Sequence, residues 1–337
     1  MHLIAAGLTD CVSGIYHQFW AQTVNGLSIG SIYAMIALGY TMVYGVLQLI
    51  NFAHSEVFMV GTVITLYAFR NWFQIDHPVG GFALIAVLIG ALLPAMFFSG
   101  LTAVSIERFA YRPLRRRGAP RLSFLITAIG ASLTIQYLFN LADGRHYLGP
   151  IKIPALLGPS PVPLPRVMET STAFTIFGED VTNKRILAIA VAFAMMIALD
   201  RFVSGTRLGR GIRAVAQDKE TASLMGVDID RVIVVTFFIG GLMAGAAGVL
   251  YMVVLGVPTQ WIIGFVPGIK AFTAAVLGGI GNIRGAMVGG LVLGLVESYS
   301  VPCFGARWNA VVAFAVLVLV LMFRPTGILG EKIGATA

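Results

Sequence analysis

Hydrophobic residues in this chain form long continuous runs that only a few short polar segments interrupt. The first run is the longest, because residues 11–55 contain no Asp, Glu, Lys or Arg. A single helix of that length would measure about 68 Å, whereas the hydrocarbon layer of a bilayer is about 30 Å thick. The run must therefore cross a membrane more than once, or cross it and re-enter, and we expect breaks at Gly39 and Gly45.

The other long runs are also continuous rather than alternating, which is typical of membrane helices and not of a β-barrel. They cover residues 82–106, 122–141, 184–199, 232–255, 285–300 and 308–323. Pro94 predicts a kink in its helix, and four glycines predict a close packing face in another, at Gly240, Gly241, Gly245 and Gly248. We predict an all-α polytopic integral membrane protein with about eight transmembrane helices, nine or ten being the alternative counts, and with broken half-helices.

A polar hexad at residues 51–56 begins the first of two short apolar segments. It contains Asn51, His54, Ser55 and Glu56, and only thirteen residues separate Glu56 from Arg70. As a helix those thirteen residues extend about 20 Å, which is too short for a full crossing. The hexad therefore lies within the membrane or at a break between two half-helices.

The second short segment lies between Lys270 and Arg284, again with thirteen residues between the two charges. Three glycines interrupt it, at Gly278, Gly279 and Gly281. It lacks the Lys and Ser/Thr of a phosphate-binding loop, so a helix break or close packing is the preferred interpretation. Two interrupted segments, one in each half of a chain, are a pointer to a transport pathway.

Composition and charge agree with a membrane protein. The chain is 58% hydrophobic and 11% charged, with a mean hydropathy of +0.87, whereas soluble domains carry about 25% charged residues. The net charge of +8 arises mainly from basic residues in two polar segments, 107–121 and 201–231. Basic loops remain on the cytoplasmic side, so these two segments face the cytoplasm and the Pro-rich segment 143–183 faces outside. The positive charge therefore requires no nucleic-acid partner.

The segment 201–231 has helical character and contains Glu220, Thr221 and Ala222, followed after three residues by Gly226. Glycine adopts the left-handed conformation that commonly ends a helix, so we predict a short helix that stops there. Such a helix between two spans is suited to a groove on a soluble partner. A solvated connecting loop is the alternative.

The other two polar segments each have two interpretations. Segment 107–121 is a topology anchor or, alternatively, a contact for a partner or anionic lipid. Segment 143–183 is a structured loop that receives a soluble partner or a passive connector, and its prolines exclude a regular helix.

His54 and Glu56 are the sharpest candidates for chemistry, because ionisable groups at membrane depth are costly. They line or gate a substrate path, or they brace the backbone at a helix break. For Glu297 and Lys270, a simple interfacial location is sufficient. We find no catalytic constellation, metal-ligand spacing or Walker glycine loop, and Cys11 and Cys303 form no disulfide framework.

Four strings together resemble the permeases of branched-chain amino-acid ABC importers, and specifically the first of their two paralogous permease subunits. The strings are NGLSIGSIYA at 25–34, LGYTMVYG at 38–45, INFAHSE at 50–56 and KAFTAAVLGGIG at 270–281. The resemblance covers nearly the whole chain, so residues 1–337 are expected to form one permease domain.

The resemblance implies a non-catalytic translocation subunit in a bacterial inner membrane. It implies a second paralogous permease, two cytoplasmic ATPase subunits that bind ATP and Mg²⁺, and a periplasmic binding protein that delivers Leu, Ile or Val. The string from Glu220 to Gly226 is similar to the ATPase-coupling motif of such permeases, with Thr221 in place of the usual Ala. We assign Arg213, Glu220, Thr221, Ala222 and Gly226 to coupling.

The remaining candidates are a translocation path or helix break formed by Asn51, His54, Ser55, Glu56, Gly278, Gly279 and Gly281. Arg284 stands where this family is expected to have Pro, which leaves the geometry of that turn open. Related permeases serve urea or short amides, so the solute is not fixed by the resemblance. Two other classes remain: an ion-coupled secondary transporter that uses His54 and Glu56, and an intramembrane enzyme, for which no nucleophile or metal site is found.

Overall fold

The computed structural model describes residues 13–142, 147–148, 151–152, 157–176 and 179–330. The chain divides into two compact units. Unit 1 comprises Met1–Ala37, Thr170–Met196 and Lys270–Ala337, and unit 2 comprises Leu38–Glu169 and Ile197–Ile269. Three helices contribute residues to both units.

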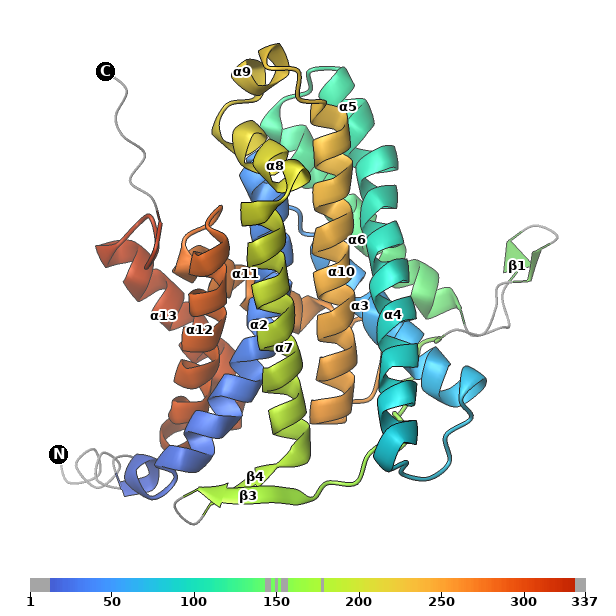
Figure 1. Cartoon of the computed structure of the whole chain (residues 1–337), viewed down its shortest axis with the longest axis vertical. Helices are drawn as coiled ribbons and strands as arrows, with labels where there is room; N and C mark the ends of the chain where they lie inside the picture. The colour runs from blue at the N-terminus through green and yellow to red at the C-terminus, as the bar shows by residue number, and fades with distance from the viewer. Residues whose placement is uncertain (1–12, 143–146, 149–150, 153–156, 177–178, 331–337) are drawn as a thin grey trace. The chain divides into compact units, whose positions relative to one another are not determined.

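The chain is almost entirely helical, as predicted (Figure 1). The long helices are α2 (Phe19–Leu47), α4 (Gly81–Ile106), α6 (Arg121–Leu141), α7 (Asn183–Gly205), α10 (Ile229–Leu255), α12 (Ile283–Phe304) and α13 (Asn309–Phe323). The short α-helices are α3 (His54–Tyr67), α5 (Arg112–Arg116), α8 (Arg207–Gln217), α9 (Lys219–Leu224) and α11 (Phe265–Gly278). The named elements of the described residues also include two π-helices, η1 (Ala68–Trp72) and η2 (Glu107–Tyr111), and one 3₁₀ turn, η3 (Ala306–Trp308).

Seven helices in the described part of the chain are long and apolar enough to cross a membrane. One of them is the continuous stretch Gly81–Arg116, which joins α4, η2 and α5. The two segments that the sequence identified as too short are α3 and α11, with 14 residues each. The predicted all-α polytopic class is therefore confirmed, with seven long spans and, at the two interrupted segments, the short helices α3 and α11.

Unit 2 is built around α10, whose small residues let α3 and α4 approach closely. A Cβ added at Gly241 would lie 2.6 Å from the Cα of Gly100, and one at Gly245 would lie 2.5 Å from the carbonyl oxygen of Ala95. A Cβ at Gly61 in α3 would lie 2.8 Å from the Cα of Gly245. The glycine face predicted for this helix is thus confirmed as a packing surface.

The expected break at Gly39 was wrong, because α2 is one continuous helix of 29 residues. Gly39 is instead a packing position, since a Cβ there would collide with the ring of His54. The helix ends at Leu47, two residues after Gly45, and Gln48 adopts a left-handed φ of 58°. The missing side chain of Gly39 therefore makes room for a neighbour and does not bend the chain.

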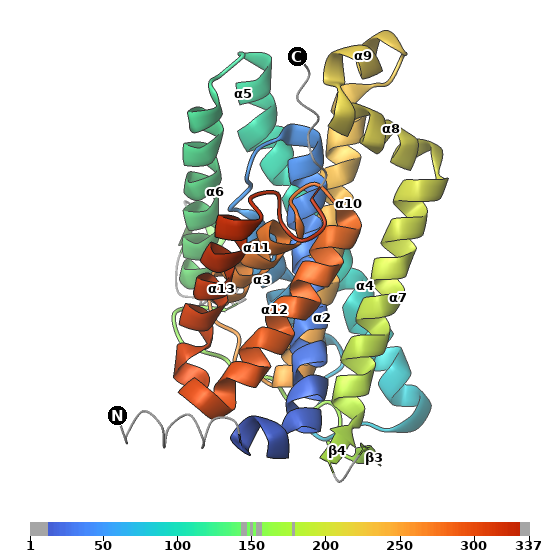
Figure 2. The same cartoon turned by 90° about the vertical axis from the view of Figure 1, so that its left-hand side faces the viewer.

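Unit 1 pairs the first half of α2 with α12, again through small residues (Figure 2). A Cβ at Gly30 would lie 2.9 Å from the carbonyl oxygen of Gly290, and one at Gly26 would lie 2.8 Å from the Cα of Leu295. Cys303 in α12 is disulfide-bonded, so the expectation of no disulfide was wrong. The only other cysteine of the sequence, Cys11, lies outside the described residues.

The Pro-rich segment 143–183 contains short strands, and no helix begins among its described residues before Asn183, where α7 starts. Strand β1 (Tyr147–Leu148) pairs with β2 (Ile151–Lys152), and β3 (Thr172–Ile176) pairs with β4 (Glu179–Thr182), both antiparallel. Residues 143–146, 149–150, 153–156 and 177–178 of this segment, including Asp143, Pro150 and Pro154, lie outside the described residues.

Candidate functional site

The polar hexad lies at a helix break in unit 2. Residues 48–53 separate α2 from α3, and the amide of His54 donates to the carbonyl of Asn51 at 3.1 Å. The side chain of Asn51 accepts a 3.0 Å hydrogen bond from the hydroxyl of Tyr111. The sequence-based interpretation of this segment as a break between helices is confirmed.

Glu56 is fully buried in the first turn of α3. Its Oε1 atom accepts hydrogen bonds from Gln136 Nε2 at 2.7 Å and from the hydroxyls of Ser55 and Ser132, each at 3.1 Å. Its Oε2 atom has no hydrogen-bond partner among the described residues. All three donors are neutral, so one carboxylate oxygen is satisfied and the other is an open acceptor.

His54 and Ser55 complete this cluster. The His54 ring contacts Tyr40 edge to face, with centroids 4.8 Å apart. Close approach around Ser55 depends on two glycines, because a Cβ at Gly264 would collide with the Ser55 carbonyl and one at Gly268 would collide with its Cβ. The hexad is therefore enclosed by small and polar groups of α2, α6 and the start of α11.

The predicted glycines Gly278, Gly279 and Gly281 lie in unit 1 and form the turn between α11 and α12. Gly279 and Gly281 have φ values of 109° and 98°, which L-residues with a side chain rarely adopt. The amide of Leu329 donates to the Gly278 carbonyl at 3.0 Å, and Asn282 caps α12 through the amide of Gly285 at 3.2 Å. The three glycines thus end one helix and admit the chain that follows α13.

Unit 1 also contains a buried ion pair. Lys270 Nζ lies 2.9 Å from Glu297 Oε2, which also accepts a 3.1 Å hydrogen bond from the Tyr33 hydroxyl. Glu297 is only 2% exposed. Lys270 and Glu297, for which a simple interfacial location was expected to suffice, are thus paired with each other inside the unit.

The segment 201–231 folds into two helices, α8 and α9, at the end of α10 where α5 also lies (Figure 1). Asp218 caps α9 by accepting from the Glu220 amide at 2.9 Å and from the Thr221 hydroxyl. The hydrogen bond from the Thr221 hydroxyl has the larger effect and that from the Glu220 amide the smaller one. Both lower the pKa of Asp218 below its usual value because they stabilise the carboxylate.

The end of α9 is a Schellman motif. The Val227 amide donates to the Ala222 carbonyl and the Gly226 amide to the Ser223 carbonyl, both at 3.0 Å. Gly226 has a φ of 83°, so the predicted glycine stop is confirmed. Ala222 is buried, whereas Glu220 and Thr221 are exposed.

Arg213 lies on α8, and its guanidinium donates to the carbonyls of Val203 and Ser204 at the end of α7. Sequence reasoning missed the most exposed apolar residues of this segment. Leu224 and Met225 at the end of α9 are 87% and 80% exposed. Two large apolar side chains in water at the tip of a short helix are suited to a partner surface.

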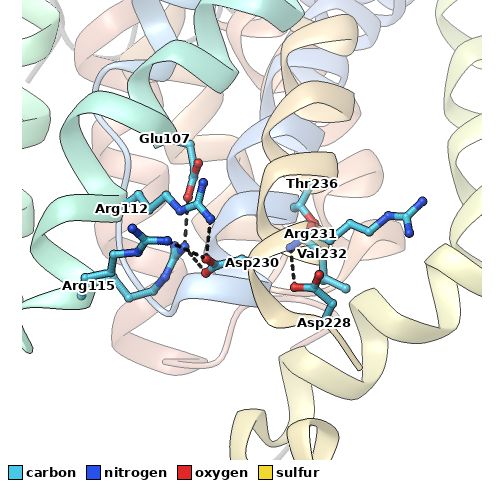
Figure 3. A network of polar contacts seen from close by, with 9 residues as sticks. Glu107, Arg112, Arg115, Asp228, Asp230, Arg231, Val232 and Thr236 are labelled. Carbon is cyan, nitrogen blue, oxygen red and sulfur yellow. Dashed lines mark hydrogen bonds and ion pairs between the residues drawn. The ribbon is translucent and has the colours of Figure 1, made fainter. Parts of the chain in front are cut away.

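A charged network anchors this segment to the end of α4 (Figure 3). Asp230, in the first turn of α10, accepts from Arg112 at 2.7 Å and from Arg115 at 2.6 Å. Arg115 also bonds the fully buried Glu107 at 3.1 Å. The network therefore joins the residues that follow α9 to the helix that precedes α6.

The family model described as "Branched-chain amino acid transport system / permease component" matches residues 22–321. That range contains every candidate residue described above. The chain belongs to this permease family. The resemblance predicted from the four sequence strings is thereby confirmed.

Curated relatives of the permease match along nearly their whole length. The high-affinity branched-chain amino acid transport system permease protein BraD of Pseudomonas aeruginosa is 42% identical over 94% of this chain and 97% of its own. LivH of Escherichia coli strain K12, with the same description, is 42% identical over 93% of this chain and 96% of its own. A probable branched-chain amino acid transport permease LivH of Methanocaldococcus jannaschii is 25% identical over 88% of each chain.

Sequence reasoning missed the donors that surround Glu56 in this permease. Gln136 and Ser132 stand four residues apart in the largely apolar helix α6, and this polar pair is a signal that could have been read. Gly264 directly precedes α11 and Gly268 lies in its first turn. The Ser132 and Gln136 pair places two polar positions on one helix face, which is the geometry that a buried polar group needs.

Proposed function

We propose that this chain is the transmembrane permease subunit of an ATP-driven importer for the branched-chain amino acids Leu, Ile and Val. The observation that carries the proposal is the 42% identity, over more than nine tenths of the chain, to permeases of high-affinity branched-chain amino acid transport systems. In this proposal the subunit is not itself an enzyme, and partner ATPase subunits bind ATP and Mg²⁺.

The assembly that we propose contains a second paralogous permease, two cytoplasmic ATPase subunits and a periplasmic binding protein, in a bacterial inner membrane. The ATPase docks against α9, where Glu220, Thr221, Leu224 and Met225 are exposed and Gly226 sets the helix end. Ala222 faces inward and keeps the helix seated.

Movement of α9 reaches the spans by two routes in unit 2. The Asp230 network links the start of α10 to Arg112 and Arg115 beyond α4. Arg213 holds α8 to the end of α7 through the carbonyls of Val203 and Ser204. A displacement of this segment is therefore carried by charge-assisted hydrogen bonds to three helices.

The solute path includes the cluster of Asn51, His54, Ser55 and Glu56. An amino acid is a zwitterion, and its ammonium group needs a buried acceptor when it leaves water. Glu56 Oε2 is such an acceptor, since its hydrogen-bonding capacity is unfilled among the described residues. The glycine turn of Gly278, Gly279 and Gly281 supplies the second interrupted segment.

Purification of the tagged chain from its native membrane, with identification of co-purifying proteins, tests the assembly. The double variant L224A/M225A removes the apolar tip of α9, and M322A/F323A is a matched control because those α13 residues are 70% and 76% exposed. We expect the ATPase to co-purify with the parent and the control and to be lost from the α9 variant. A chain that is recovered alone and moves leucine in liposomes without ATP would establish an ion-coupled transporter instead.

Uptake of labelled leucine by the reconstituted complex tests the solute. Competition by isoleucine and valine, and none by urea or acetamide, is the expected result. Competition by urea or acetamide alone would assign the subunit to an importer of short amides.

A further inference from the structure

A basic hollow of about 480 Å³ lies at the end of α4 and is lined by Arg108, Arg112, Pro113, Arg116 and Arg117. Four of its five lining residues are arginines. Only Arg112 and Arg116 approach an acidic side chain, Asp230, at 2.7 and 3.8 Å. Arg108 and Arg117 form no ion pair with any described residue, so the hollow keeps an excess of positive charge.

We propose that this hollow binds the phosphate headgroup of an anionic phospholipid of the cytoplasmic leaflet. Guanidinium groups bind phosphate oxygens through two parallel hydrogen bonds, and several of them around one hollow suit a phosphodiester. Basic pockets at the cytoplasmic ends of membrane helices are a recognised form of headgroup site. The inference is independent of the solute and of ATPase docking.

The surface beside the hollow is apolar and continuous with the span. Phe109 is 81% exposed and is the neighbour in sequence of Arg108, which lines the hollow. In α4, which directly precedes this segment, Leu101, Phe97 and Leu93 are spaced four residues apart and are 47%, 54% and 60% exposed. Residues four apart lie on one face of an α-helix, so an exposed apolar row of α4 leads toward the headgroup site and acyl chains can follow it.

This row favours a lipid over an acidic protein surface as the occupant. A soluble partner would have to cover Phe109 and the exposed apolar residues of α4, which lie within a candidate membrane span, Gly81–Arg116. A phospholipid matches both features, because its charged headgroup can bind the arginines while its acyl chains lie along the exposed apolar residues of α4. Charge complementarity and the apolar continuation thus point to one occupant.

Native mass spectrometry of the delipidated full chain with added phosphatidylglycerol tests the proposal. The variant R108Q/R117Q removes the two arginines without an acidic partner and leaves the Asp230 network intact. The matched control R207Q/R210Q removes the same charge from exposed positions of α8. We expect binding of phosphatidylglycerol to weaken about 10- to 30-fold in the first variant and by less than about threefold in the control.

Three further arms complete the test. R108K/R117K retains the charge and is expected to recover most of the binding, which would show that the loss follows from the removed charge. The melting temperature of R108Q/R117Q, expected near that of the parent, checks that this variant is folded. Phosphatidylcholine is expected to bind the parent weakly, and excess inorganic phosphate is expected not to displace phosphatidylglycerol. Equal binding by parent and R108Q/R117Q, equal loss in both glutamine variants, or displacement by inorganic phosphate would each overturn the proposal.

Discussion

Two buried glutamates in this permease have opposite surroundings. Glu297 in unit 1 accepts from Lys270 and Tyr33, so its charge is matched by a cation 2.9 Å away. Glu56 in unit 2 accepts only from the neutral groups of Gln136, Ser55 and Ser132. In both glutamates the other carboxylate oxygen has no hydrogen-bond partner among the described residues, so the difference lies in the cation. Both carboxyl groups are almost inaccessible, at 2% and 0% exposed.

The two environments indicate different roles: Glu297 stabilises the fold, and Glu56 belongs to a candidate binding site. In a buried ion pair each charge compensates the other, and removal of one partner is strongly destabilising. A carboxylate surrounded by neutral donors has accepting capacity that a cation or proton can fill. We therefore expect Glu297 to matter for stability and Glu56 to matter for transport.

The largest effect is expected where the ion pair is broken. K270M leaves Glu297 buried without its cation and is expected to lower the free energy of unfolding by about 3–5 kcal/mol. Thermal unfolding of the purified protein measures it. The double variant K270M/E297L replaces both charges by apolar groups and should recover most of the loss. If K270M melts like the parent, the pair is not a brace.

The second effect concerns function at Glu56. E56Q retains an oxygen for Gln136 and the two serines, so its melting temperature should remain near that of the parent. Loss of the charge is expected to weaken leucine uptake at low concentration about tenfold or more, since a hydrogen bond to a charged group contributes about 1.5–3 kcal/mol. E179Q, the same change in strand β4, is the control. Unchanged uptake by E56Q would remove Glu56 from the solute path.

A smaller effect on stability is expected when a hydrogen-bond donor to Glu56 is removed. Q136L removes the shortest hydrogen bond to Glu56, at 2.7 Å, and is expected to cost about 1–3 kcal/mol of stability because a buried acceptor loses its partner. T134V on the same helix removes an exposed hydroxyl that bonds only the Gly130 carbonyl, and should change stability by less than about 0.5 kcal/mol. Equal melting of the two variants would mean that the Glu56 cluster is not tightly built.

The smallest effect is expected at an acid that remains in water. The pKa of Asp218 is lowered in the folded chain, so its cap is fully present above the ordinary carboxyl pKa and is lost as the pH falls through the lowered value. Below about pH 4, amide exchange at the start of α9 should therefore accelerate. D218N should remove this pH dependence, and an identical acid profile in D218N would show that another group is responsible.

The sequence predicted those features that depend on length and local conformation. Polar residues at 51–56 marked a real break, and Gly226 marked a real helix end, because both follow from what the backbone can adopt locally. The break predicted at Gly39 was wrong, because a glycine in a membrane helix can serve close packing as readily as bending.

The donors around Glu56 and the Lys270–Glu297 pair could not be located from spacing alone. Gln136 lies 80 residues from Glu56, and Lys270 lies 27 residues from Glu297. Such contacts depend on how the helices pack, and a single sequence does not show which residues of different helices come into contact. Periodicity identifies a polar position within a span but not the residue that it meets.

The glycine contacts among α3, α4 and α10 have a mechanical consequence. At Gly61, Gly241 and Gly245 one backbone rests against another, with no side chain between them to change rotamer and absorb a shift. One helix could slide past another only if the distance between the two helices first increased. These three helices should therefore travel as one piece whenever the permease changes form, and the bending has to occur where the helices stop, at joints such as residues 48–53.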